Sequence, residues 1–311
     1  MANQQKKTSI GGQALIEGIL MRGPRKTAIV VRQSNGEMVE KVEDVGTGTH
    51  RRWARLPLIR GVVSFWDSMK YGVGALNYSA SFFEDEEDYE PGRFEKWLTE
   101  KVGSKKLESM MMTVAVILGI AMPVALFFLL PTFISGFFGE GLPSIVRNLI
   151  EGCVRMVIFF LFIYLTSKQK DVHRTYMYHG AEHKTIACYE AGLPLTVENA
   201  RVQNRRHPRC GTSFLFVVMI VGILFTALFA WGENPLVRMA LRLALLPAIV
   251  AVSYEINRFA GRHDNTLTRV LRAPGLFMQR FTTFEPDDSM LEVAITAMNR
   301  VIPENDQEDR W

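Results

Sequence analysis

Four long apolar segments interrupt a chain that is otherwise rich in charged residues. Each is close to the ~20 residues that a helix needs to cross the hydrocarbon core of a bilayer. The pattern predicts four transmembrane helices, at residues 109–131, 144–166, 211–231 and 236–254. The alternative is a set of helices buried in a soluble domain. It suits the first and third segments poorly, because they are too long and too apolar.

Lysine and arginine indicate the side of the membrane on which each loop lies, because these residues accumulate in cytoplasmic loops. They are frequent before the first segment, between the second and third, and after the fourth. The two remaining loops, 132–143 and 232–235, contain none. All three basic regions fall on one side only if there are four spans. We therefore expect a multi-pass protein in a lipid bilayer, with both termini in the cytoplasm.

The polar regions predict a small cytoplasmic α+β domain attached to an α-helical polytopic membrane protein. Its parts are residues 1–108, 167–210 and 255–302. Asn35-Gly36 between two β-rich runs predicts a β-hairpin near residues 27–42. The glycine-containing stretch before it, 11–24, predicts a loop and a first strand.

Three further segments have a distinct character. Residues 58–83 are apolar and aromatic but interrupted by Arg60 and Asp67, which predicts an amphipathic helix at the inner membrane face. The alternative is an ordinary helix packed on the cytoplasmic domain. The acidic run 84–90 predicts a solvated linker, and the polar end, 303–311, predicts a disordered tail.

Charge and cysteine content exclude two classes of protein. The net charge of +4 comes with no long basic run, so the chain is not expected to bind nucleic acid. The three cysteines are scattered and odd in number, which argues against a disulfide framework.

Histidines are concentrated in the cytoplasmic loop 167–210, where four of the six lie. His179 and His183 are four residues apart, so on a helix they share one face and both imidazoles can reach one metal ion. His207 and Cys210 have the three-residue spacing of a chelating turn. Together they predict a His₃Cys zinc site, with another divalent metal as the alternative.

The same stretch matches H-x-x-E-H, the inverted zincin motif, in which two histidines bind zinc and the glutamate is the general base. Glu182 is then the catalytic residue, and one more protein ligand is needed. Three residues are candidates for it: His207, Cys210 and Glu255. Structural zinc, catalytic zinc and histidines that only form hydrogen bonds all remain open at this point.

Charged residues also occur inside the second and fourth apolar segments, where they should face inward and pair. They are Arg147, Glu151, Arg155, Arg238 and Arg242. One interpretation is that an anionic lipid phosphate lies among the four arginines. The alternative is that Arg147 and Arg238 reach the outer interface. Glu151 then pairs with the other two arginines.

Several strings of residues together resemble a known family. They are Gly11-Gly12-Gln13-Ala14, Met21-Arg22-Gly23-Pro24, His179-Gly180-Ala181-Glu182-His183-Lys184, His207-Pro208-Arg209-Cys210 and Glu285-Pro286-Asp287-Asp288. The chain resembles the YqhQ-like family of uncharacterised bacterial membrane proteins over nearly its whole length. The resemblance implies a multi-span protein of the bacterial inner membrane and a predicted metal-dependent enzyme, without naming a reaction.

Three functions are therefore considered. The first is a membrane-bound, zinc-dependent hydrolase, such as a protease, with its site at the cytoplasmic membrane face. The second is a non-enzymatic membrane scaffold that recruits a protein partner and contains a structural zinc site. The third is lipid or anion transport through the charges in the second and fourth segments.

Overall fold

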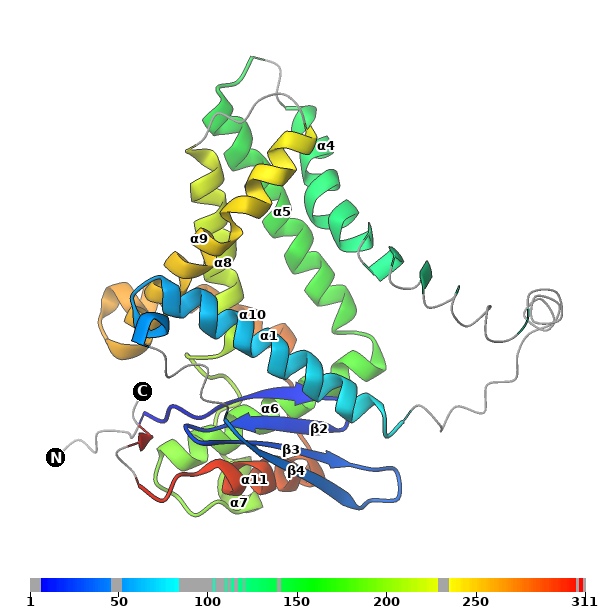
Figure 1. Ribbon diagram of the computed structural model, residues 1–311, viewed down its shortest axis with the longest axis vertical. Helices are drawn as coiled ribbons and strands as arrows, with labels where there is room; N and C mark the ends of the chain where they lie inside the picture. The colour runs from blue at the N-terminus through cyan, green and yellow to red at the C-terminus, as the bar shows by residue number, and fades with distance from the viewer. Residues whose placement is uncertain are drawn as a thin grey trace.

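A sheet with several helices packed against it lies at one end of the molecule, and a bundle of apolar helices lies at the other (Figure 1). The computed structural model describes residues 7–45, 52–83, 103, 110, 113–114, 117–119, 121–138, 141–228, 235–305 and 308–309. Within them the chain is mostly helical, with one four-stranded antiparallel sheet. Helix α1 (Ile59–Ala80) crosses between the helical bundle and the sheet (Figure 1).

The sheet is a simple meander in which each strand pairs with the next. Its strands are β1 (Gly11–Leu15), β2 (Gly18–Arg22), β3 (Lys26–Arg32) and β4 (Met38–Asp44). The predicted hairpin corresponds to β3 and β4, whose turn contains Gly36 at φ 88°. The stretch before it forms two strands where the sequence predicts one. Glu17 in their turn has φ 49°, a conformation that residues other than glycine rarely adopt. A glutamate at this position therefore does not indicate a turn.

Helices cover both faces of the sheet. On one face, Ile19, Met21 and Val30 pack against α6 (Lys170–Glu190) and α11 (Asp288–Val301). On the other face, the alternate strand residues form a second cluster with Ala75 of α1; they include Leu15, Leu20 and Val31. Because β2 is buried on both faces, it lacks the polar alternation of a half-exposed strand. This packing fixes β1 directly beside α6.

Among the residues that the structure describes, three helices are long and apolar enough to cross a membrane, by length and composition alone. They are Ile117–Gly136, Ser144–Thr166 (α5) and Leu243–Arg262, which is part of α9 (Pro235–Arg262). The first includes the π-helical turn η3 (Ala125–Leu129) and α4 (Leu130–Gly136). The third predicted span contains α8 (Gly211–Ala227), whose 17 residues measure about 26 Å. The structure thus gives three such helices and one shorter apolar helix where the sequence predicts four spans.

Helix α5 contains an ion pair that is hydrogen-bonded to the first apolar helix. Glu151 is 1% exposed and lies 2.8 Å from the guanidinium of Arg155. It also accepts a hydrogen bond from Thr132, while Arg155 donates to the carbonyl of Phe127 at 2.8 Å. This contact agrees with the interpretation in which Glu151 neutralises Arg155. The side chains of Arg238 and Arg242 lie outside the described part of the chain.

The other helical elements of the described residues are two short ones, η2 (Arg52–Arg55) and α7 (Val197–Arg201), and the longer α10 (Thr266–Thr282). The structure differs from the prediction of a disordered tail in the part that it describes. Asp309 is 1% exposed and accepts hydrogen bonds from Ser9 and Tyr189 at 2.9 Å each. These bonds hold Asp309 beside the segment that leads into β1. The acidic run 84–90 lies outside the described residues.

Candidate metal centre

Helix α6 carries the two histidines of the H-x-x-E-H motif in its buried middle. The helix ends where Gly192 takes the left-handed conformation, at φ 69°. The Leu193 N–H then bonds back to the Cys188 carbonyl at 3.2 Å, as in a Schellman motif. This fixed end and the sheet above hold His179 and His183 one helical turn apart, facing the same pocket.

Cys210 comes from a different element, the N-terminus of α8. Its sulfur caps that helix by accepting a hydrogen bond from the Thr212 N–H at 3.4 Å. The loop before it is held by Gln279 of α10, which is fully buried. The Gln279 amide accepts from the His207 N–H and donates to the His207 carbonyl, both at 2.8 Å. Helix α10 therefore fixes the position of Cys210 relative to α6.

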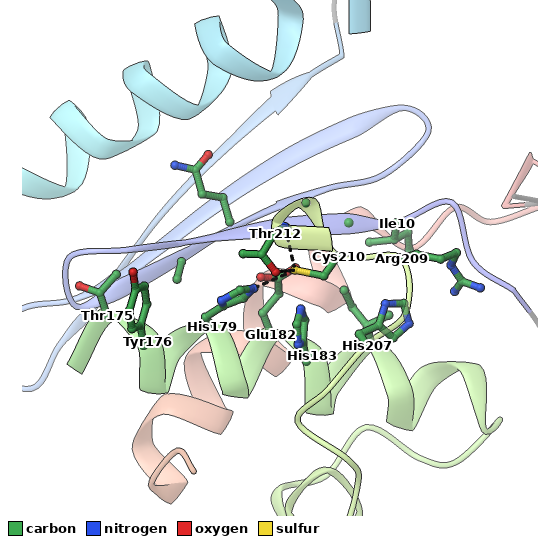
Figure 2. Close-up of a pocket in the computed structure, with 16 residues that line it drawn as sticks. Ile10, Thr175, Tyr176, His179, Glu182, His183, His207, Arg209, Cys210 and Thr212 are labelled. Atoms are coloured by element: carbon green, nitrogen blue, oxygen red, sulfur yellow. Dashed lines mark hydrogen bonds between the residues drawn. The ribbon is translucent and has the colours of Figure 1, made fainter. Parts of the chain in front are cut away.

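The structure brings His179, His183 and Cys210 together. One potential ligand atom from each lies within 4.8 Å of the others. The Nε2 of His179 is 3.2 Å from the Cys210 sulfur. Figure 2 shows these side chains and Glu182 directed into one pocket between β1, α6 and the start of α8. Ligand atoms around a tetrahedral zinc ion lie about 3.5 Å apart, so this cluster is close to the required size.

Hydrogen bonds orient both imidazoles with Nε2 toward the cluster. The Nδ1 of His179 is 2.7 Å from the Thr282 carbonyl, and the Nδ1 of His183 is 2.6 Å from the Arg205 carbonyl. Metal-binding histidines commonly donate their second N–H in this way. The Nε2 of His183 and one carboxylate oxygen of Glu182 are buried without a hydrogen-bond partner among the described residues. Such groups are expensive to bury unless a ligand satisfies them, so the site fits a metal ion.

The electrostatics of the cluster favour a thiolate. Burial raises the pKa of the Cys210 thiol, but the charges of His183 and His179 outweigh it and hold that pKa well below its usual value. Burial lowers the pKa of His179, yet the Cys210 thiolate outweighs this and raises it to about 9. Burial also raises the pKa of Glu182, and the two histidines only partly oppose that effect. A metal ion must therefore displace a proton from His179.

Zinc binding is expected to weaken as the pH falls. Below the raised pKa of His179, the ligand nitrogen is protonated, so each zinc ion that binds releases that proton. The apparent affinity should rise about tenfold per pH unit between about pH 6 and 8. Competition with a chromophoric chelator, corrected for its own protonation, measures this slope. An affinity independent of pH would contradict a histidine ligand.

His207 lies beside the cluster but is paired elsewhere. Its ring centroid is 5.8 Å from that of His183, and its Nε2 is 3.2 Å from a carboxylate oxygen of Glu190. The same carboxylate accepts hydrogen bonds from Arg209 and from the Thr8 N–H. Burial raises the pKa of Glu190, but His207 and Arg209 outweigh it, so the pKa is lowered and the group stays ionised.

The structure does not bring Glu255 to the cluster. It lies on α9, where it forms a two-pronged ion pair with Arg60 of α1. It also accepts a hydrogen bond from the Leu58 N–H at 3.2 Å. The sequence proposes Glu255 as a candidate ligand because it follows the fourth apolar segment. Arg60 is 195 residues away in the sequence, and no local pattern predicts that it pairs with Glu255.

Sequence reasoning missed two residues that shape the site. Glu190 follows His183 by seven residues, which is two turns along the same face of α6, so helical periodicity could have found it. Gln279 gave no signal, because a single glutamine in an amphipathic helix is ordinary. Only the folded arrangement shows that it clamps the loop that carries Cys210.

Comparison with known proteins places this site in a family. A family model described as "Protein of unknown function (DUF1385)" matches residues 56–304, which include α6 and Cys210. The chain belongs to this family. It is 30% identical over 310 residues to the "Uncharacterized protein YqhQ" of Bacillus subtilis (strain 168), covering 97% of this chain and 95% of the Bacillus protein. This confirms the family resemblance noted in the sequence. No solved structure matches the chain significantly.

Proposed function

We propose that this protein is a zinc-dependent hydrolase, in which His179, His183 and Cys210 hold the metal and Glu182 is the general base. The observation that carries the proposal is the meeting of the three ligand atoms within 4.8 Å of one another. Three protein ligands leave one position for water or substrate, which is the arrangement of catalytic zinc sites. Another divalent metal is the alternative occupant.

The residues have distinct roles in this proposal. Zinc held by three protein ligands supplies Lewis acidity to a water molecule and to the substrate carbonyl. Glu182 takes the proton of the attacking water at its carboxylate. The water oxygen then bonds to the carbonyl carbon, the bond to the leaving group breaks, and Glu182 returns the proton to the leaving group. Burial of Glu182 raises its pKa and suits it to both steps.

The contacts of His207 favour catalytic zinc over a closed structural site. A structural His₃Cys site needs His207 as its fourth ligand. The Nε2 of that residue is instead paired with Glu190, whose lowered pKa keeps the partner charged. The residues of the site also line a pocket of about 440 Å³, which gives a substrate access to them. A structural site needs no such opening.

We also propose that the chain spans a bacterial inner membrane four times and carries this site at the cytoplasmic face. The basic loops support that orientation. Helix α8 starts directly after Cys210, so the cluster adjoins an apolar helix. One face of α1 exposes large apolar side chains, which suits an amphipathic helix on the bilayer; Trp66, Met69 and Val73 are 50% to 71% exposed.

Metal content per chain, measured by mass spectrometry on detergent-purified protein, tests the proposal. Wild type should contain about one zinc ion, and His183→Ala and Cys210→Ala should contain almost none. Glu255→Gln is the matched control, because Glu255 lies away from the cluster. His207→Ala should keep its zinc if Glu190 is the true partner of that histidine. Absence of zinc from wild type purified without chelator would refute the metal site.

A further inference from the structure

We infer that the substrate is a polypeptide in extended conformation, which binds as an added strand along the outer edge of β1. The inference rests on the proposed hydrolase function and names its substrate class. Exposed strand edges offer backbone N–H and C=O groups that recognise another peptide backbone. In this protein such an edge borders the candidate metal centre.

The register of the sheet identifies the groups at that edge. β1 is an outer strand, and it joins β2 through the two-residue turn Ile16-Glu17. Such a turn makes Leu15 and Gly18 a hydrogen-bonded pair, and such pairs recur at every second residue. The N–H and C=O of Gly12 and Ala14 therefore point away from β2. Within the described part of the chain, no backbone group is bonded to them.

This edge lies against the catalytic residues. The pocket of the metal centre is lined on one side by residues 10–14 and on the other by His179, Glu182 and Cys210. Figure 2 shows β1 running above α6 along the length of the pocket. A side chain at Gly12 would begin 3.0 Å from the Glu182 carboxyl carbon, so these two residues are in direct contact. A strand paired with β1 would pass its own peptide bonds beside the proposed base.

The two edges of the sheet differ in the way expected if only one binds peptide. Proteins usually protect a free edge with charged residues or proline. The far edge, β4, has four charged residues among seven: Glu40, Lys41, Glu43 and Asp44. β1 has none, and it begins with Gly11 and Gly12, both exposed. The unprotected edge is the one at the candidate metal centre.

A peptide is the ligand class that fits the spacing of these groups. Equivalent groups on one edge of a strand repeat every second residue, about 6.8 Å apart. Another extended backbone matches that repeat, whereas a small ester or amide contacts only one position. The two outward-facing residues, Gly12 and Ala14, can bond to residues i and i+2 of the substrate.

Cleavage of β-casein, an unfolded protein, tests the inference in the full-length chain. Ala14→Pro removes an outward N–H without removing a bond to β2, and proline is tolerated at such edge positions. Casein cleavage should fall at least tenfold, while zinc content should stay at about one per chain. The matched control is Val42→Pro in the far edge strand. Gln33 and Glu37 are a hydrogen-bonded pair, and such pairs recur at every second residue along β3 and β4, which leaves Val42 between two of them. The Val42 N–H therefore points away from β3, and the substitution removes no bond of the sheet. This variant should cleave casein at the wild-type rate.

A second measurement does not depend on the folding of a variant. A peptide of about ten residues around one cleaved casein bond is made with single N-methyl groups at successive positions. Each methyl removes one backbone donor. Wild-type cleavage should fall at alternate positions only, with a period of two residues. Equal tolerance at all positions, or equal loss at all of them, would overturn strand pairing.

Hydrolysis of 4-nitrophenyl acetate, which has no peptide backbone, separates the inference from the proposed function. Zinc-dependent hydrolysis of this ester without cleavage of casein would overturn the peptide inference and support a hydrolase of another specificity. Failure with both substrates by zinc-loaded wild type would count against hydrolysis itself, and the inference would fall with it. Cleavage of casein by Ala14→Pro at the wild-type rate would overturn the inference alone.

Discussion

Replacing Glu182 with glutamine is expected to slow hydrolysis by about 10²–10⁴-fold, the usual contribution of a general base. Glutamine keeps the size of the side chain but cannot accept the proton of the attacking water. Glu182 is not one of the three residues that meet as metal ligands, so zinc should remain at about one per chain. The two measurements are the turnover rate and the zinc content of the same purified sample.

The matched control is Glu198→Gln, the same substitution at an exposed glutamate of α7. It should leave both turnover and zinc content unchanged. Loss of zinc from Glu182→Gln would make Glu182 a ligand and not a base. Full activity with zinc retained would remove Glu182 from the mechanism, and would favour a structural role for the metal.

The part of the site that could be predicted from the sequence depends on local spacing. His179 and His183 are four residues apart on one helix, so their shared face follows from helical geometry alone. Cys210 could be proposed because it follows His207 by three residues in the sequence. Its position beside α6, however, depends on contacts with residues far away in the sequence. The clamp formed by Gln279 and the capping of α8 decide its position.

Two proposed ligands went elsewhere because a distant partner competes for each. Arg60 pairs with Glu255, a contact for which the sequence gives no signal, and Glu190 of α6 pairs with His207. A charged partner at hydrogen-bond distance outweighs a merely suitable spacing. The types of ligand can therefore be read from the sequence, whereas their number and the choice among them need the fold.

The sheet likewise contains one hairpin that the sequence predicts and one that it does not. Asn35-Gly36 is a strong local turn signal, and the hairpin of β3 and β4 follows from it. The hairpin of β1 and β2 turns at Ile16-Glu17, which has no such signal, so β1 could not be recognised as a separate edge strand. The strand edge that we infer to bind substrate could therefore not be predicted from the sequence.

Gly180→Ala is expected to destabilise the protein and to weaken zinc binding, although alanine normally favours a helix over glycine by about 1 kcal/mol. A β-carbon at Gly180 would lie 2.0 Å from the carbonyl oxygen of Phe284, a backbone atom that cannot rotate away. The segment after α10 must then move away from α6, and overpacking of this kind costs about 1–3 kcal/mol. The same movement pulls the Thr282 carbonyl from His179, which it orients at 2.7 Å.

Thermal unfolding and zinc affinity, measured on the same preparation of Gly180→Ala, test this coupling between packing and metal binding. The melting temperature should fall by several degrees, and zinc affinity should drop about 10–100-fold as the supporting contact of a ligand is lost. Gly74→Ala is the matched control, because that glycine lies in α1 and a β-carbon there meets nothing within 4 Å. The control should be as stable as wild type or more so. A Gly180→Ala protein that melts lower but binds zinc normally would show that the Thr282 carbonyl does not orient a ligand.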